Sequence, residues 1–597
     1  MKSLKHLNKY FYKYRLRFLL GFLFVVLNNF FAVASIKYIG DAVNYVKEAL
    51  KNNKTQDPVL DQLLIYGGLI IGMALLMGLF MFFMRQTIIV MSRLIEYDLK
   101  NEVYDHYQKL DQAFYKRNNT GDLMNRISED VSRVRMYIGP SIMYIINTVG
   151  TFILTVIAMF KVDIHLSLYT LAPLPVLAIS IYFVSERINK KSNKVQAQLS
   201  NLSTHTQEAF SGIRVLKAYV REGRSHDHFE KESIEYRTKN LSLVRTESLF
   251  QPFMILLIGL SSILTIYIGG SEYLDGKIKT GDITVFFMYI NRLVWPIASL
   301  GWVTSLVQRA AASQSRINEF LDTQPSIQNP DPVPYEIKGK IEFRNVSFVY
   351  ADSGTKALDN VSFSINAGES LAVIGRTGSG KSSIAALITR LYDVNEGTIF
   401  IDDKNIREVN LYSLRSQTGY VPQEVFLFSD TIGNNIAFTS EERKSEVGGK
   451  KLEVKNNKEL IEQAAKDAAI YSNIIEFPEK FETMVGERGI TLSGGQKQRI
   501  SIARAIIKEP RILIFDDCLS AVDTETEEEI LNNLTRIMKS RTSIIISHRV
   551  SSVKNASKVI VLDNGKIVEQ GTHNELLEKK GVYFELYQKQ VLEEQKM

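Results

Sequence analysis

The stretch SLAVIGRTGSGKSS, residues 370–383, decides the fold of the C-terminal half of the chain. An apolar strand at 371–374 runs into Gly375, and four residues later a G-K-S run at 380–382 opens an expected helix. Glycines let backbone N–H groups approach phosphate oxygens closely, and the N-terminus of a helix favours anions. Strand, glycine-rich loop and helix in this order predict an α/β nucleotide-binding domain with a parallel sheet.

The loop supplies the expected contacts to the nucleotide phosphates. We expect Lys381 to reach the β- and γ-phosphates and the Ser382 hydroxyl to bind Mg²⁺. The nucleotide-binding residues predicted here are Gly375, Thr377, Gly378, Ser379, Gly380, Lys381, Ser382 and Ser383.

A second apolar strand, in RILIFDD at 511–517, ends in two acids. Ligands of open α/β sheets bind at the carboxyl ends of the strands, so Asp516 is the predicted Mg²⁺ partner, through water. The position after this acid is commonly Glu in nucleotide hydrolases, but here it is Asp517. The neighbouring Cys518 is the single cysteine, which excludes an intrachain disulfide. We expect a small buried side chain in a reduced compartment, with a reactive thiol as the alternative.

The N-terminal half is apolar enough to cross a membrane. A bilayer needs about 20 apolar residues per spanning helix. The first apolar run is too long for a cleavable signal and has no small-residue cleavage site, so it is interpreted as the first span. The predicted spans are 18–36, 62–84, 136–160, 164–185, 248–271 and 283–308.

Basic residues set the predicted orientation. The N-terminal segment before the first span carries Lys2, Lys5, Lys9, Lys13, Arg15 and Arg17. The positive-inside tendency places this segment in the cytoplasm. Because the number of spans is even, both termini are then cytoplasmic. The same tendency accounts for the net charge of +7. No stripe of basic and aromatic residues indicates nucleic acid. The long connections at 85–135 and 186–247 have helical periodicity and many charges, so they should extend the spans into the cytoplasm.

Polar residues inside spans are functional candidates because they are costly in lipid. For Asn28, Asn29, Asn147 and Asn291 the simplest expectation is hydrogen bonding between helices. Arg292 carries a full charge, which needs water or a partner, and an aqueous cavity is one expected surrounding.

Four prolines, at 325, 330, 332 and 334, mark an extended linker. The predicted domains are a membrane domain at 1–324, the linker at 325–338 and a nucleotide-binding domain at 339–597. Within the last, residues 439–459 form a charged, glycine-containing insertion that we expect to be solvated.

The segment LSGGQKQR, 492–499, together with the two motifs above, makes the chain resemble the ATP-binding-cassette (ABC) family over nearly its whole length. The resemblance implies an all-α six-span membrane domain of the exporter fold, followed by an α/β P-loop NTPase cassette with a helical subdomain. Such a chain looks like a half-transporter.

The resemblance also implies residue roles. Tyr350 matches the aromatic residue that stacks on adenine, and His548 matches the residue that contacts the γ-phosphate. Gln423 matches the residue that touches Mg²⁺ and water, which gives Ser382, Gln423 and Asp516 as the metal set. The catalytic set is Asp517, His548 and Gln423. A nucleotide bound at a partner's phosphate loop would also contact this chain. The residues that would make this contact are Ser493, Gly494, Gly495 and Gln496.

Four further segments match parts of the family that transmit motion or cross the dimer. Residues 114–131 and 211–224 resemble the two cytoplasmic loops, 485–489 the segment that contacts them, and 520–523 the loop that crosses the cassette dimer. Because each ATP lies between one cassette's phosphate loop and the other's LSGGQ, the chain needs a second half-transporter.

The implied function is ATP-driven export of an amphipathic drug, lipid or peptide from the cytoplasm or inner leaflet, by alternating access in the cell (inner) membrane. A heterodimer is favoured over a homodimer, and membrane lipid is a further partner. A regulatory or channel-like ATP-binding subunit and an importer on the exporter fold stay as alternatives.

Asp517 departs from the family pattern. Aspartate stops short of the position of a Glu carboxylate by about one C–C bond, ~1.5 Å, and a displacement near 1 Å can cost ~10²-fold in rate. We therefore expect a site that binds ATP and hydrolyses it slowly. The alternative is that the backbone adjusts and Asp517 acts normally.

Overall fold

The computed structural model describes residues 2–52, 56–330, 333–439, 457–486, 492–518 and 524–594. They divide into two compact units. One comprises Met1–Gln108 and Gly121–Thr323, and the other Lys109–Thr120 and Gln324–Met597.

The first unit is helical and contains six helices long and apolar enough to cross a membrane among the residues described. They extend over Arg15–Lys51, Gln56–Lys109, Thr120–Val162, Ile164–Ser211, Glu222–Leu274 and Thr280–Leu321, and each includes one predicted span. The six-span prediction is therefore confirmed. The helical elements of this unit are η1 (Lys2–Leu7), α1 (Asn8–Lys13), α2 (Arg15–Lys51), α3 (Gln56–Met84), η2 (Arg85–Ile89), α4 (Val90–Lys109), α6 (Thr120–Asn125), η3 (Arg126–Asp130), α7 (Val131–Met136), η4 (Tyr137–Ser141), α8 (Ile142–Val162), α9 (Ile164–Leu171), α10 (Pro173–Ser211), α11 (Ile213–Ala218), α12 (Glu222–Leu274) and α13 (Thr280–Leu321).

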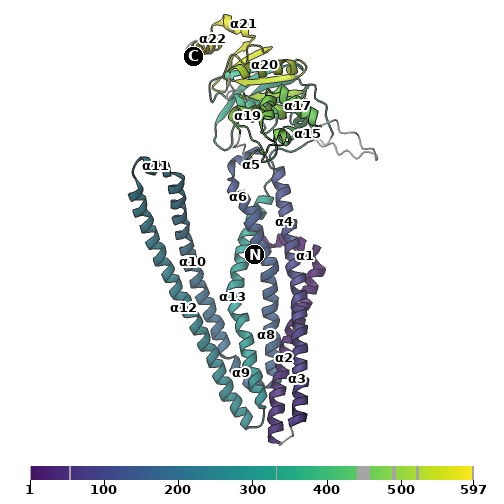
Figure 1. The fold of residues 1–597 in the computed structure, drawn as a ribbon, viewed down its shortest axis with the longest axis vertical. Coiled ribbons are helices and arrows are strands. Elements are labelled where there is room, and N and C mark those ends of the chain that lie inside the picture. The colour runs from purple at the N-terminus through teal and green to yellow at the C-terminus, as the bar shows by residue number, and fades with distance from the viewer. Residues whose placement is uncertain are drawn as a thin grey trace, which may run out of the picture. The chain divides into compact units, whose positions relative to one another are not determined.

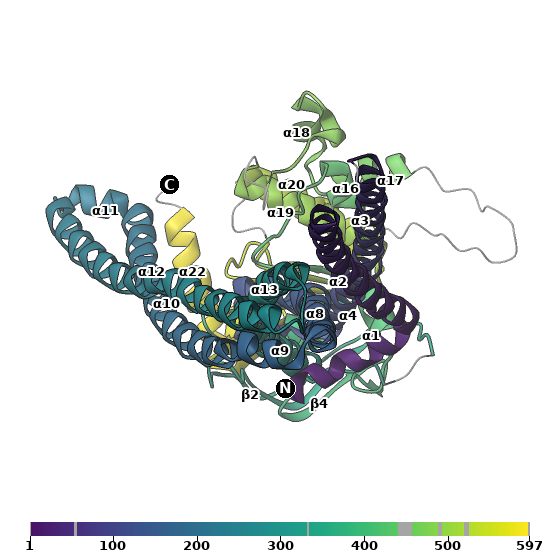
Figure 2. The same cartoon turned by 90° about the horizontal axis from the view of Figure 1, so that it is seen from below.

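The long charged connections continue the spans as helices, as their periodicity predicts. The span in α3 passes through η2 into α4, and α10 and α12 run side by side to a turn formed by α11 (Figure 1). Within the membrane unit this pair diverges from the other helices towards α11 (Figure 2). Three π-helical segments, η2, η3 and η4, interrupt the helices near their passage out of the spans. These wide helical turns were not predicted from the sequence.

The second unit is built on two sheets. The larger has the strand order β10-β9-β3-β8-β7-β6, in which β9, β3, β8, β7 and β6 are parallel, and the smaller has the antiparallel order β2-β1-β4-β5. The strands are β1 (Ile341–Val349), β2 (Lys356–Ile365), β3 (Ser370–Gly375), β4 (Glu396–Ile401), β5 (Lys404–Asn405), β6 (Thr418–Val421), β7 (Ile512–Asp516), β8 (Thr542–Ser547), β9 (Lys558–Asp563) and β10 (Lys566–Gly571). The helices are α5 (Gln112–Arg117), α14 (Lys381–Ile388), α15 (Leu411–Ser416), α16 (Ile432–Ala437), α17 (Asn457–Asp467), α18 (Tyr471–Glu476), η5 (Lys480–Glu482), α19 (Gly494–Ile506), α20 (Thr524–Met538), α21 (His573–Lys579) and α22 (Val582–Glu594).

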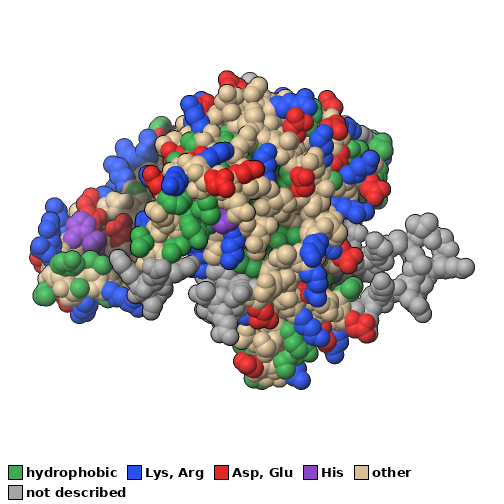
Figure 3. Space-filling view, turned by 90° about the horizontal axis from the view of Figure 1, so that it is seen from above, with side chains coloured by type: hydrophobic (Ala, Val, Ile, Leu, Met, Phe, Trp, Pro, Cys, Tyr) green, Lys and Arg blue, Asp and Glu red, His purple; other side chains and the backbone are tan. Residues whose placement is uncertain are grey.

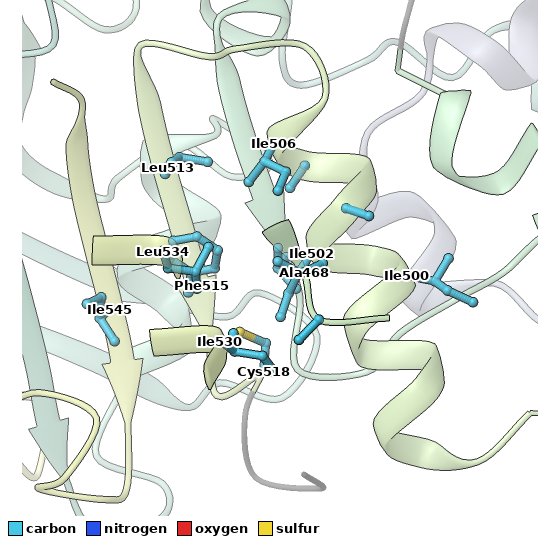
Figure 4. Close-up of a cluster of buried hydrophobic side chains, with 14 of the residues drawn as sticks. Ala468, Ile500, Ile502, Ile506, Leu513, Phe515, Cys518, Ile530, Leu534 and Ile545 are labelled. Atoms are coloured by element: carbon cyan, nitrogen blue, oxygen red, sulfur yellow. The ribbon is translucent and has the colours of Figure 1, made fainter. Parts of the chain in front are cut away.

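The core of the larger sheet fixes where β7 ends. Every residue of β7 is buried, and Phe515 packs with Ile502 of α19 and Leu534 of α20 (Figure 4). Cys518 belongs to the same cluster and is 3% exposed, in agreement with the expectation of a small buried side chain. A continuously apolar strand buried on both faces is typical of parallel sheets. Its burial places the two acids at its end at the edge of the sheet.

Candidate functional site

The phosphate-binding loop lies between β3 and α14, as predicted. Gly380 is the residue before α14 and has φ +98°, a conformation that residues with a Cβ avoid. A Cβ there would lie 2.1 Å from the carbonyl oxygen of Ala357. Gly378 also has a positive φ, +81°, but an added Cβ would meet nothing within 4 Å. Both positions thus favour glycine because of their backbone conformation, and Gly380 is also required because a side chain would not fit.

Two side chains of this loop have unusual surroundings. The Lys381 ammonium donates to the carbonyl oxygens of Gly375 at 2.9 Å and Arg376 at 2.8 Å, and burial lowers the pKa of Lys381. The Ser379 hydroxyl is buried and has no hydrogen-bond partner among the described residues. An unpaired buried hydroxyl is uncommon. A phosphate oxygen in the loop would satisfy it, so the residues present fit a nucleotide phosphate.

Asp516 and Ser382 meet as the two motifs predict. The Ser382 hydroxyl donates to Asp516 Oδ1 at 2.9 Å. Asp516 is 2% exposed, and burial raises the pKa of its carboxyl. Hydroxyl and carboxylate oxygens are the ligand types that Mg²⁺ prefers, and these two converge on one place.

The ends of three neighbouring parallel strands bring the predicted catalytic residues together. Gln423 follows β6, Asp517 follows β7 and His548 follows β8. Asp517 Oδ2 lies 3.6 Å from His548 Nε2 and accepts from Gln423 Nε2 at 3.4 Å. Burial raises the pKa of Asp517, which is 8% exposed. Its φ of +47° is tolerated best by short polar side chains such as Asp and Asn.

Ser493 begins α19 with a capping box. Its hydroxyl accepts from the backbone N–H of Gln496, whose side-chain oxygen accepts from the backbone N–H of Ser493. Gly494 and Gly495 form the first turn of the helix, so their N–H groups lie at its N-terminus. No hydrogen bond between residues 493–496 and the phosphate-binding loop is found within the described parts of the cassette.

Tyr350 is half-buried beside the loop, and its hydroxyl lies 3.0 Å from the Ser383 hydroxyl. Two residues that the sequence did not predict lie near Tyr350. The ring of Tyr392 lies 5.3 Å from that of Tyr350, and the Lys116 ammonium of α5 lies 4.5 Å from the centre of the Tyr350 ring. The three residues are far apart in the chain, and no sequence pattern relates them to one another, so only the fold shows their proximity.

Some expectations fall on residues outside those described. They are segment 520–523, residues 487–489 of the segment 485–489, and all but the two ends of the 439–459 insertion. The segment that resembles the first cytoplasmic loop forms most of α5, then α6 and η3, and the second forms α11 with the start of α12.

The polar residues of the spans have three kinds of surroundings. Asn29 donates to Asn147 Oδ1 at 3.0 Å, which confirms hydrogen bonding between α2 and α8. Asn28 is buried, and its Oδ1 has no hydrogen-bond partner among the described residues. Asn291 instead donates to Phe287 O in its own helix, so the expectation of a bond between helices is wrong there. Arg292 donates to Asn29 Oδ1 at 3.1 Å.

Comparisons with known proteins agree with this architecture. The family model for the ABC transporter transmembrane region matches residues 18–297, and the model for the ABC transporter matches 358–520. The multidrug resistance-like ATP-binding protein MdlA of Escherichia coli (strain K12) is 33% identical over 99% of this chain and 97% of its own length. An ATP-dependent lipid A-core flippase of Syntrophus aciditrophicus (strain SB) is 36% identical over 83% of this chain and 80% of its own.

A solved structure, of a bacterial Atm1-family ABC exporter with ATP bound, matches with a TM-score of 0.78 at 26% identity, over 96% of this chain and 98% of that one. The fold and site thus define a six-helix membrane domain fused to one P-loop nucleotide-binding cassette. Together with its relatives, they show that the chain belongs to the ABC transporter superfamily and has the exporter-type half-transporter arrangement.

Proposed function

We propose that this protein exports an amphipathic substrate across the cell membrane, driven by ATP, as half of a dimer. The observation that carries the proposal is the convergence of Ser382, Asp516, Asp517, Gln423 and His548 at one edge of the cassette sheet, in a chain that also has six apolar helices. The two termini and the cassette would lie in the cytoplasm, because the segment before the first span is basic.

The loop residues hold the nucleotide in this proposal. Lys381 exchanges its bonds to the Gly375 and Arg376 carbonyls for the β- and γ-phosphates, and Ser379 donates its free hydroxyl to a phosphate oxygen. Tyr350 stacks on adenine. Ser382, Asp516 and Gln423 would hold Mg²⁺, which would neutralise negative charge on the nucleotide. His548 donates to the γ-phosphate.

Asp517 orients the attacking water and accepts its proton, but from too far away. Its carboxylate lies against His548 and Gln423, and Asp is one methylene shorter than Glu. A displacement near 1 Å can cost ~10²-fold in rate. Binding does not depend on this carboxylate, so the site binds ATP well and hydrolyses it slowly.

The second half of each nucleotide site comes from a partner. Ser493 and the N–H groups of Gly494 and Gly495 lie at a helix N-terminus, which favours a γ-phosphate presented by another cassette. The turn between α10 and α12 also exposes apolar side chains in the region of Phe210, Val215, Tyr219 and Val220. Hydrophobic and charged side chains lie together at the end of the membrane unit that contains α11 (Figure 3). A second half-transporter would cover it, and one that supplies Glu at the position of Asp517 would complete a fast site.

Closure of two cassettes around ATP shifts the membrane helices between two arrangements, because ATP binds the closed state better. Transport in sealed inverted vesicles tests this directly. With a fluorescent anionic amphiphile and the cationic dye Hoechst 33342 as parallel probes, we expect ATP-dependent accumulation of at least one of them inside the vesicles, and of neither with the Lys381→Ala variant. Accumulation only in right-side-out vesicles would indicate an importer, and ATP binding with no flux in either would indicate a regulatory subunit.

The assignment of the two half-sites has its own test. Ser493→Ala should reduce transport-coupled ATPase activity much more than Asp517→Ala, because Ser493 serves the partner's competent site. Equal losses of ATPase activity from the two substitutions would contradict the proposal of a heterodimer with one slow site.

A further inference from the structure

Arg292 is the only Asp, Glu, Lys or Arg within the six predicted spans. It lies on α13, twelve residues after the start of that helix, which is about 18 Å of helix rise. A charge at such a depth is expensive unless it is paired or hydrated. The surroundings of its guanidinium therefore indicate what it is for.

The protein itself gives Arg292 little compensation. Its Nη2 donates to Asn29 Oδ1 at 3.1 Å, while its buried Nε has no hydrogen-bond partner within the described residues. No ion pair to Arg292 is found in the described part of the chain. The nearest acid before it on α13 is Asp282, about 15 Å away along the helix, and Asp41 is about 18 Å from Asn29 along α2. A positive charge is thus held without a counter-charge.

The guanidinium is held in place by the side-chain amide of Asn29, all of whose hydrogen-bonding positions are occupied. Asn29 is 1% exposed, and its Oδ1 accepts from both Arg292 and the Thr151 hydroxyl. Its Nδ2 donates to Asn147 Oδ1 and to Val25 O, both at 3.0 Å. All four hydrogen-bonding positions of the amide are used. Side chains from α2, α8 and α13 therefore fix one face of Arg292 and leave its remaining donors for another group.

A mostly apolar space lies along two of these helices, α8 and α13, although Arg292 itself is not part of its lining and Arg85 and Gln86 are. A cavity of about 470 Å³ is bounded by Arg85, Ile89, Met136, Met143, Tyr144 and Trp302, among others. Tyr144 is three residues from Asn147 on α8, about 4.5 Å of rise, and Trp302 is ten residues from Arg292 on α13, about 15 Å of rise. Tyr144 and Trp302 pack edge to face, with ring centroids 5.2 Å apart. The cavity has room for the apolar part of a ligand whose charged part extends along α13.

We propose that Arg292 binds the anionic group of the transported substrate, so that the substrate is an anionic amphiphile with a phosphate or carboxylate head. This rests on the transport function proposed above and names the chemical class of its substrate. A guanidinium with free donors binds oxyanions by charge-assisted hydrogen bonds. The anion supplies the counter-charge that the spans lack, and its apolar body occupies the cavity.

Binding can be measured without ATP, which separates this proposal from the transport function. The chain has two tryptophans, Trp295 and Trp302, both on α13 within ten residues of Arg292. The full-length protein in phosphatidylcholine nanodiscs is titrated with brominated twelve-carbon amphiphiles that quench tryptophan and carry phosphate, carboxylate or trimethylammonium heads. We expect the anionic probes to bind more tightly, and Arg292→Gln to weaken them about tenfold or more while leaving the cationic probe unchanged. Arg292→Lys should keep most of the preference.

Two variants control for indirect effects. Arg309→Gln removes the same charge from an exposed position on the same helix and should leave all three affinities unchanged. Thr151→Val removes a hydrogen bond to Asn29 without removing the charge, so it should lower the thermal stability and keep the anion preference. If Thr151→Val abolished the preference as completely as Arg292→Gln, or if the parent protein had none, Arg292 would be a structural residue and the proposal would be wrong.

The source of the anion is separated by repeating the titration in phosphatidylglycerol nanodiscs. If a lipid headgroup binds Arg292, phosphatidylglycerol should lower the affinity of the parent protein for the anionic probe. The affinity of Arg292→Gln should then stay the same in both lipids. If a non-lipid amphiphile is the ligand, the two lipids give the same difference between parent and variant. Loss of ATP-driven transport with this binding intact would instead contradict only the proposed function.

Discussion

Asp516 and Asp517 are neighbours in the chain, yet they have different partners. Asp516 accepts from the Ser382 hydroxyl, whereas Asp517 lies against His548 and Gln423. A strand end sends successive side chains in different directions, so adjacent carboxylates reach separate places. This separation supports the proposal that Asp516 binds the metal ion and Asp517 faces the attacking water.

The two left-handed glycines of the phosphate-binding loop allow a matched test. In Gly380→Ala the new Cβ would lie 2.1 Å from Ala357 O, while in Gly378→Ala it meets nothing within 4 Å. Both changes carry the backbone strain of about 1–2 kcal/mol, but only the first forces the loop to move. We expect ATP affinity, measured with a fluorescent ATP analogue, to fall by at least about tenfold more for Gly380→Ala. Similar losses for both variants would show that conformation alone, and not space, demands Gly380.

Lys508 makes stability depend on pH. Burial lowers its pKa from 10.5 to about 8, and its ammonium donates to Arg415 O at 3.0 Å. Between pH 8 and 10.5 the folded form has lost this proton while the unfolded form keeps it, so stability rises with pH across this window. The thermal midpoint of the full-length protein should therefore increase less from pH 7.5 to 9.5 in Lys508→Met than in the parent. An identical rise in both would assign the pH dependence to other groups.

At the scale of elements, the regular pieces follow from local patterns. The strand at 371–374, the glycine loop and the apolar run at 512–515 became β3, the loop before α14 and β7, because propensity, pattern and burial agree there. The π-helical turns η2, η3 and η4 were not predicted, since one extra residue in a turn leaves the hydrophobic pattern almost unchanged. The pairing of Tyr350 with Tyr392 and Lys116 was likewise hidden, because no local rule relates residues so distant in the chain.

One of these unpredicted turns is tied to α13. Asp130, in η3, is 3% exposed and accepts from Arg316 Nε at 2.9 Å and from the Ser313 hydroxyl at 2.8 Å. Replacing Arg316 leaves a buried carboxylate unpaired, which is destabilising even though the arginine is partly exposed. We expect Arg316→Gln to lower the thermal midpoint by roughly 3–5 °C, and Arg309→Gln, at an exposed position on the same helix, to change it by less than about 1 °C. Equal effects would mean that the pair does not hold η3.

At the scale of the whole molecule, the motif at 493–496 and the phosphate-binding loop are the two halves of the nucleotide site that the proposed partner would bring together. The architecture was predictable because six apolar stretches and two nucleotide motifs are each strong local signals. The identity of the partner and the substrate was not, because both depend on surfaces formed by residues scattered through the chain.

The partner can be identified by purification. When the tagged chain is isolated from its native membrane under mild detergent, we expect a second half-transporter with Glu at the position of Asp517 to accompany it in equal amount. Mass spectrometry of the complex measures this. A complex that contains only copies of this chain would favour the homodimer with two slow sites.

The most direct test of the account is the ATPase rate of Asp517→Glu, measured on the purified full-length chain reconstituted in liposomes without any other half-transporter, so that every site contains residue 517 of this chain. The added methylene moves the carboxylate by ~1.5 Å, so kcat should rise by about tenfold or more, with KM for ATP changed by less than about threefold because Lys381, Ser382 and Asp516 are intact. Thermal unfolding controls for strain at the positive φ of this residue. A folded Asp517→Glu protein with unchanged or lower kcat would contradict the claim that this carboxylate limits hydrolysis.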